Sequence, residues 1–161
     1  MLGRGMIRSM TAQPRSGAER KADTVAKFEA EGADVWVATA SASGVAHLVP
    51  LSYAWDGTHL IIATEPELLT VRNMAASGRA RLGFGPTRDV VIVDAELDGQ
   101  IDVNEAPETL GELYAHQSRW DPRREKVPFV FLLLRLQRVQ AWREADELDR
   151  RTLMRDGAWL F

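Results

Sequence analysis

The residues best suited to binding chemistry lie in a short polar turn, LLTVRNM (68–74), which connects two apolar segments. Thr64, Thr70, Arg72 and Asn73 supply hydroxyl, guanidinium and amide donors in this region. Backbone N–H groups at the start of a short helix bind anions without any named motif. An anion site is one interpretation, and capping of the turn by Thr70 beside a solvated Arg72 is an equally good one.

Other residues with catalytic potential have simpler explanations. His47 would need partners to bind a metal, yet His59 and His116 fall at no helical spacing with it, and the sequence contains no HExxH. Ser41 and Ser43 flank a turn and lack the G-x-S-x-G context of a nucleophile. We therefore interpret the histidine as a structural or surface residue and the serines as turn residues.

Four carboxylates alternate along one predicted strand: Asp94, Glu96, Asp98 and Asp102. Such a row can hold a metal ion or supply a pair for acid–base catalysis. A solvated strand face explains the row as well, and the last carboxylate lies beyond Gly99, where the strand can bend away. The sequence therefore predicts no metal site, and it contains no glycine-rich phosphate-binding loop.

Composition excludes several classes of protein. The chain has 161 residues, 45% of them hydrophobic and 27% charged, which is typical of one globular domain. It contains no cysteine, so it has no disulfide framework and no thiol nucleophile. A net charge of -3 argues against a protein that neutralises nucleic-acid phosphates.

The termini and apolar runs favour a cytoplasmic protein. The longest apolar run, PFVFLLL (128–134), is far shorter than the roughly 20 residues of a membrane helix. The N-terminus lacks the continuous apolar segment of a signal peptide. We expect residues 1–15 to form a flexible arm and residues 16–161 to form a single domain.

Periodicity and turn signals place the secondary structure. The sequence predicts a helix from Ser16 to Gly32, strands at 34–40, 45–55, 59–64, 79–84, 89–103 and 128–144, a helical turn at 68–74 and a helix at 106–117. Asp56-Gly57 is a strong hairpin signal, and a bulge is expected near Arg138 and Val139. Six strands in mostly meander order, without βαβ alternation, predict a mainly β fold: an antiparallel barrel with peripheral helices.

Several of these segments, in this order, carry a family resemblance. AHLVPLSYAWDGTHLIIAT, TVRNM, GRARLGFG and TRDVVIVDAELDG span about 45–99, and FVFLLLRLQRVQAW and RTLMRDGAWLF extend the likeness. The sequence resembles the pyridoxamine 5'-phosphate oxidase-like, FMN-binding split-barrel family, especially the actinobacterial branch that includes deazaflavin-dependent reductases. The resemblance implies a six-stranded split β-barrel and a homodimer with two cofactor sites at the subunit interface.

The resemblance also implies a cofactor site. FMN is the first choice, and deazaflavin coenzyme F-420 is the second. The ring would lie along Leu48, Val49, Pro50, Leu51 and Ser52, and the phosphate would lie near Ala63, Thr64, Leu69, Thr70, Val71, Arg72 and Asn73. Many members carry a lysine, often beside an arginine, where this chain has Leu69 and Thr70. Arg72, Arg79 or Arg88 would then replace the missing cations.

The implied activity is that of an oxidoreductase that reduces a small conjugated or heteroaromatic substrate by hydride transfer from the cofactor. Two alternatives stay open: a non-catalytic protein that binds a flavin or another planar ligand, and a structural dimer with a degenerate site. The partner subunit and the C-terminal segment would build part of the substrate pocket, here with Tyr114, Trp120, Trp142 and the tail to Phe161. No catalytic side chain is predicted.

Overall fold

The computed structural model describes residues 13–161. In chain order the elements are α1 (Gly17–Phe28), β1 (Asp34–Ala40), β2 (Ala46–Trp55), β3 (His59–Thr64), α2 (Leu69–Ser77), β4 (Arg79–Phe84), β5 (Val90–Asp102), α3 (Glu108–Ser118), the 3₁₀ turn η1 (Pro122–Arg124), β6 (Val130–Trp142), the 3₁₀ turn η2 (Ala145–Arg150), β7 (Thr152–Arg155) and β8 (Ala158–Trp159). Most of the predicted N-terminal arm, residues 1–12, lies outside the described residues.

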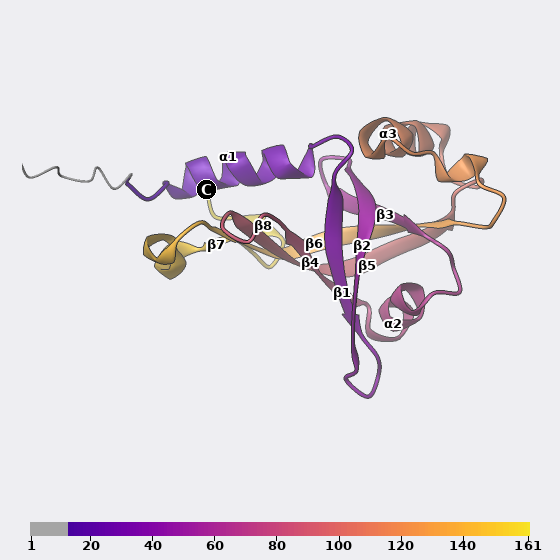
Figure 1. The fold of residues 1–161 in the computed structure, drawn as a ribbon, viewed down its shortest axis with the longest axis horizontal. Coiled ribbons are helices and arrows are strands. Elements are labelled where there is room, and N and C mark those ends of the chain that lie inside the picture. The colour runs from indigo at the N-terminus through magenta and orange to yellow at the C-terminus, as the bar shows by residue number, and fades with distance from the viewer. Residues whose placement is uncertain (1–12) are drawn as a thin grey trace, which may run out of the picture.

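Six strands close into an antiparallel barrel, which confirms the predicted fold class. The strand order is β3-β2-β1-β4-β5-β6, and pairing of β3 with β6 closes the barrel. Figure 1 shows α1 and α3 on the outside of the barrel and α2 near its lower end. The short strands β7 and β8, which were not predicted, extend the sheet beyond β6 as a hairpin.

Alternation along the strands separates a barrel interior from an outer face. Val35 and Val37 of β1 point into the core, whereas Trp36 between them is exposed. Strand β3 is buried on both faces because its other side packs beneath α3, where Ile61 joins a second apolar cluster around Tyr114. The continuous apolar run of this strand follows from this double burial.

The helix cap and the turn that local sequence signals predict are present in the structure. Ser16 and Glu19 make a reciprocal capping box at the start of α1. Asp56 accepts hydrogen bonds from two backbone N–H groups in the turn between β2 and β3. A bulge interrupts β6 at Gln137, one residue before the predicted position.

A salt-bridged anchor fastens the start of the described chain to the barrel. Arg15 contacts Glu147 of η2 at 2.8 Å and Asp23 of α1 at 2.7 Å. The hydrogen bonds from Arg15 lower the pKa of Glu147 to about 2. Arg15, which the predicted boundary places in the arm, is therefore tied to the folded domain. Within residues 13–161, no helix is long and apolar enough to cross a membrane.

Candidate cofactor site

The barrel wall opens between β2 and β3. These strands pair only from Tyr53–Trp55 to Leu60–Ile62. Beyond that point β2 continues to Ala46 paired with β1, and β3 continues to Thr64 paired with β6. Within the described chain, residues 46–52 thus have one edge without a strand partner. Backbone N–H and C=O groups on such an edge are available to a ligand.

Tyr114 of α3 fixes the point where the two strands separate. Its side chain is fully buried, and its hydroxyl accepts a hydrogen bond from the Ala63 N–H at 3.1 Å and donates one to the Ser52 carbonyl at 2.9 Å. Burial raises the pKa of Tyr114, so the hydroxyl keeps its proton. One side chain therefore replaces strand pairing and sets the spacing of Ser52 and Ala63, two of the predicted site residues.

The predicted ring-binding residues of β2 expose an apolar surface. Leu48 is 58% exposed, and Pro50 lies beside the exposed Trp36 of β1 through strand pairing. Ser52, on the same face, donates from its hydroxyl to Asp34 at 3.1 Å. Val49 and Leu51 are half-buried on the opposite face. A flat apolar ligand can contact this outer surface, and the free backbone edge lies beside it.

Helix α2 begins without a side-chain cap. Leu68 is the N-cap residue, and its carbonyl accepts the N–H groups of Val71 and Arg72 at 3.1 and 3.2 Å. Thr70 is 2% exposed and does not cap the helix, so the capping interpretation of this residue is wrong. The N–H groups of Leu69 and Thr70 precede these two hydrogen bonds, and they suit an anion.

The remaining residues of this helix divide into two roles. Asn73 is buried and donates to Thr39 Oγ1 at 3.1 Å, so it joins α2 to β1. Val71 is buried in the barrel core. Arg72 is exposed and forms no ion pair within the described residues, whereas Leu69 is 52% exposed beside it. Arg72 is therefore the cation at this helix start that is available to a ligand.

Arg88 lies far from this helix within the same chain. It belongs to the turn between β4 and β5, whereas α2 leads into the opposite end of β4. Six strand residues separate these ends by roughly 20 Å. The Arg88 guanidinium instead pairs with Glu144 at 3.1 Å. The structure thus brings together β2, β3 and Tyr114, but it does not bring Arg88 to α2 of the same chain.

The acidic row on β5 forms ion pairs. Asp94 accepts from Arg81 at 2.6 Å, and Asp98 accepts from His59 at 2.9 Å. Hydrogen bonding to the histidine lowers the pKa of Asp98. Among residues 13–161, no three His, Cys, Asp or Glu side chains are grouped as a metal site requires.

Of the aromatic residues predicted to line a substrate pocket, Tyr114 lies at the split between β2 and β3. Tyr114 is fully buried, Trp120 packs against it and donates to Glu125 at 2.7 Å, and Trp142 lies beneath Arg151. The tail lies along α1, where the Trp159 ring is 5.2 Å from Lys21 Nζ. The sequence contained no local signal for the bridging role of Tyr114, because that role depends on how α3 packs on the sheet.

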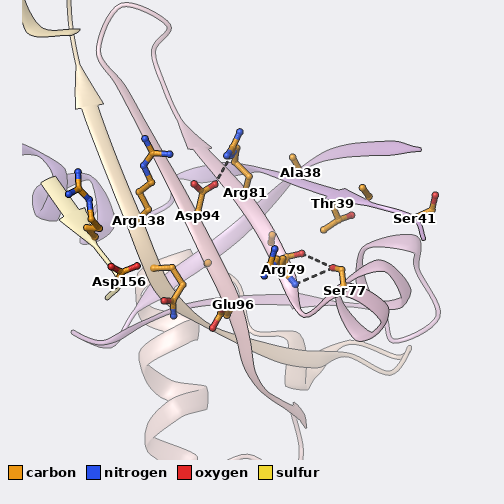
Figure 2. Close-up of a pocket in the computed structure, with 15 residues that line it drawn as sticks. Ala38, Thr39, Ser41, Ser77, Arg79, Arg81, Asp94, Glu96, Arg138 and Asp156 are labelled. Atoms are coloured by element: carbon orange, nitrogen blue, oxygen red, sulfur yellow. Dashed lines mark hydrogen bonds and ion pairs between the residues drawn. The ribbon is translucent and has the colours of Figure 1, made fainter. Parts of the chain in front are cut away.

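A groove of about 740 Å³ lies on the outer face of β1, β4, β5 and β6. The end of α2 and the turn between β7 and β8 border it (Figure 2). Arg79, one of the three arginines predicted to replace the missing cations, lines this groove, whereas the predicted cofactor residues of β2, β3 and α2 do not. The groove adjoins the predicted ring-binding surface, because Ala38 of its lining lies opposite Leu48 in the pairing of β1 and β2.

Comparison with models of protein families assigns the chain to one family. The family model for pyridoxamine 5'-phosphate oxidase matches residues 22–143, which include the whole barrel from β1 to β6. The chain belongs to the pyridoxamine 5'-phosphate oxidase family. This match confirms the resemblance seen in the sequence. No curated protein matches the chain.

Three solved structures illustrate the range of this family's fold. An F-420 reductase has a TM-score of 0.56 at 16% identity, with 70% of this chain and 92% of that one covered. A Listeria innocua protein described as a candidate pyridoxamine 5'-phosphate oxidase has a TM-score of 0.58 at 12% identity, covering 77% and 98%. The haem storage protein HutZ from Vibrio cholerae has a TM-score of 0.54 at 13% identity, covering 74% and 92%. At these identities, the similarity supports the shared fold alone.

Proposed function

We propose that this member of the family binds FMN, or deazaflavin coenzyme F-420 as the second choice, and acts as an oxidoreductase on a small conjugated or heteroaromatic substrate. The observation that carries the proposal is the free edge of β2, which Tyr114 holds apart from β3. The uncapped start of α2 and the similarity of fold to an F-420 reductase support it.

The residues at the split fit the chemistry of either cofactor. The pyrimidine edge of a flavin or deazaflavin needs hydrogen-bond donors and acceptors, and the unpaired backbone edge of 46–52 provides both. The flat ring needs apolar contacts, which Leu48 and Pro50 offer. The phosphate needs donors and a cation, and we assign these to the first turn of α2 and to Arg72.

The cofactor, once bound, would supply hydride transfer. The chain itself would bind and orient the ring through β2, and Tyr114 would keep the strands at the right spacing. Because the cofactor carries the reaction, the lack of a predicted nucleophile is compatible with an enzyme.

We also propose a homodimer with cofactor sites at the subunit interface. Trp36 is 51% exposed and lies beside Leu48 and Pro50 on the outer face of β1 and β2. Leu68 and Leu69 add exposed apolar surface at the start of α2. A second copy that covers these side chains would remove them from water and shield a bound ring.

The alternative is a non-catalytic protein that binds a planar ligand. The structural similarity to HutZ favours this candidate. HutZ is a haem storage protein, so a barrel of this fold can bind a planar ligand without catalysing a reaction.

The absorption spectrum and a turnover assay separate the two functions. Purified full-length protein is expected to show flavin or deazaflavin absorbance after cofactor is added, and the reduced cofactor is expected to lose its hydride to a quinone such as menadione. A bound but unreactive cofactor, or binding of haem instead, would support the alternative. Protein that binds none of the three ligands would contradict both functions.

A further inference from the structure

The outer groove has the size of a small-molecule site. Its volume of about 740 Å³ lies within the range of ligand pockets. Two small outward-facing side chains of β1, Ala38 and Ala40, help to create this space, whereas Ala80 and Ala95 of the lining have side chains buried in the barrel core. Longer polar side chains surround them, and Figure 2 shows Arg79, Arg81 and Arg138 around the opening.

Two carboxylates of the groove are already engaged by arginines. Asp94 accepts from Arg81 at 2.6 Å, and Glu96 contacts Arg135 at 3.4 Å. Strand pairing sets the first contact, because Arg81 and Asp94 lie directly opposite each other on β4 and β5. These two carboxylates are therefore not free to neutralise the other arginines of the groove.

Three arginines of the groove lack a carboxylate partner. Within residues 13–161, Arg79, Arg138 and Arg155 form no ion pair, and residues 1–12 contain no Asp or Glu. With the Gln140 amide turned so that its oxygen faces the donors, this oxygen accepts a hydrogen bond from Arg138 Nη2 at 2.9 Å. The amide is uncharged, so it does not neutralise the arginine. Asp156 is the remaining carboxylate of the lining, so the groove has an excess of positive charge.

The fold fixes the backbone positions from which these three arginine side chains extend. Arg79 belongs to β4, Arg138 to β6 and Arg155 to β7, so three strands of one sheet present them. Arg138 lies opposite Asp94 in the strand pairing, on the same outer face. Guanidinium groups bind carboxylates and phosphates through paired hydrogen bonds, and a rigid sheet lowers the entropic cost of gathering several of them.

We propose that the groove binds the anionic end of a small-molecule ligand that carries phosphate or carboxylate groups. Arg79, Arg138 and Arg155 recognise the anion, and Ala38 and Ala40 contact the less polar part of the molecule. The site goes beyond the proposed cofactor site, because none of the residues assigned to the cofactor lines the groove.

Calorimetric titration of the full-length protein tests this site without any cofactor. Pyrophosphate is the phosphate probe and citrate is the carboxylate probe, both at constant low ionic strength because salt screens exposed charges. At least one probe is expected to bind with a Kd below about 1 mM. The probe that binds more tightly identifies the anion class.

Variants locate the bound anion. The triple variant Arg79→Gln, Arg138→Gln and Arg155→Gln is expected to weaken binding at least about tenfold. Arg150→Gln, which removes an exposed charge from η2, is expected to leave it unchanged, and Arg72→Ala at the proposed cofactor site reports any binding at α2 instead. The proposal is overturned if neither probe saturates the protein by about 10 mM, or if the triple variant binds like the wild type. Equal loss in Arg72→Ala would place the anion at α2 and would also overturn it.

Discussion

Tyr114 is the residue that connects the fold to the proposed site. Its hydroxyl satisfies one donor of β3 and one acceptor of β2 at the point where the ladder between them ends. Tyr114→Phe leaves the buried Ala63 N–H and the half-buried Ser52 carbonyl without this partner, so we expect a loss of about 1–3 kcal/mol in the free energy of unfolding. Urea denaturation measures this loss. We also expect weaker FMN or F-420 binding, because the spacing of Ser52 and Ala63 is no longer fixed.

Tyr53→Phe is the matched control for this change. The Tyr53 hydroxyl donates to the Lys27 carbonyl at the end of α1, away from the split. This variant should lose stability but keep the affinity for cofactor. Equal effects of the two variants on cofactor binding would contradict a positioning role for Tyr114.

Leu69 offers a gain-of-function test at the start of α2. It is half-exposed at a position where many family members carry a basic residue, so a longer side chain fits there. Leu69→Lys adds a charge-assisted hydrogen bond of about 1.5–3 kcal/mol to a bound phosphate. We expect cofactor affinity to rise roughly tenfold or more, as measured by fluorescence titration.

Leu148→Lys is the control for added charge, because Leu148 is an exposed leucine on η2. It should leave cofactor affinity unchanged. If Leu69→Lys binds no better than this control, the phosphate does not lie at the start of α2.

At the scale of elements, the segment before α1 is joined to η2 by the ion pair between Arg15 and Glu147, whose side chains are 12% and 4% exposed. The pKa of Glu147 lies near 2 in the folded protein, below its ordinary 4.5, chiefly because Arg15 donates hydrogen bonds to it. Because the pKa of Glu147 is lower in the folded state, its ionised carboxylate stabilises the protein above about pH 4.5. This stabilisation is lost as the pH falls toward 2. The shift corresponds to roughly 3 kcal/mol.

Glu147→Gln is therefore expected to destabilise the protein by roughly 3 kcal/mol at neutral pH. The difference from the wild type should shrink as the pH falls from about 4.5, in urea titrations at several pH values. Asp146→Asn, on the same turn, should show little difference at any pH. A difference of the same size at pH 7 and near pH 3 would exclude the linkage.

Short strands bounded by turn residues could be predicted from the sequence almost to the residue. The strands 34–40 and 59–64 have their predicted bounds, and Asp56-Gly57 marks the hairpin before the second. The hairpin of β7 and β8 was missed because strands of four and two residues carry too little periodicity. Its position beside β6 follows from tertiary pairing.

The composition of the site was harder to predict because it depends on topology. Arg88 looked close to α2 because it follows the next strand in sequence. In an antiparallel meander, however, α2 and the β4–β5 turn lie at opposite ends of β4. Tyr114 was expected in the substrate pocket, and its bridging role could not be predicted because that role depends on how α3 packs on the sheet.

For the whole molecule, the proposed homodimer makes a prediction about the outer face. Trp36→Glu places a charge among the exposed apolar side chains of β1 and β2, and burial of that charge in an interface is costly. We expect light scattering after gel filtration to report a dimer for the wild type and a monomer for this variant. Val127→Glu, an equally exposed apolar residue before β6, should stay dimeric. A monomeric wild type would contradict the dimer.

Titration of the cofactor-free wild type, Arg72→Ala and Arg124→Ala with FMN and with F-420 tests whether the start of α2 holds a cofactor phosphate. We expect one cofactor to bind the wild type in the micromolar range and to bind Arg72→Ala at least about tenfold more weakly, with Arg124→Ala unchanged. Equal millimolar binding of both cofactors, or an affinity that Arg72→Ala leaves unchanged, would contradict a cofactor phosphate held at the start of α2.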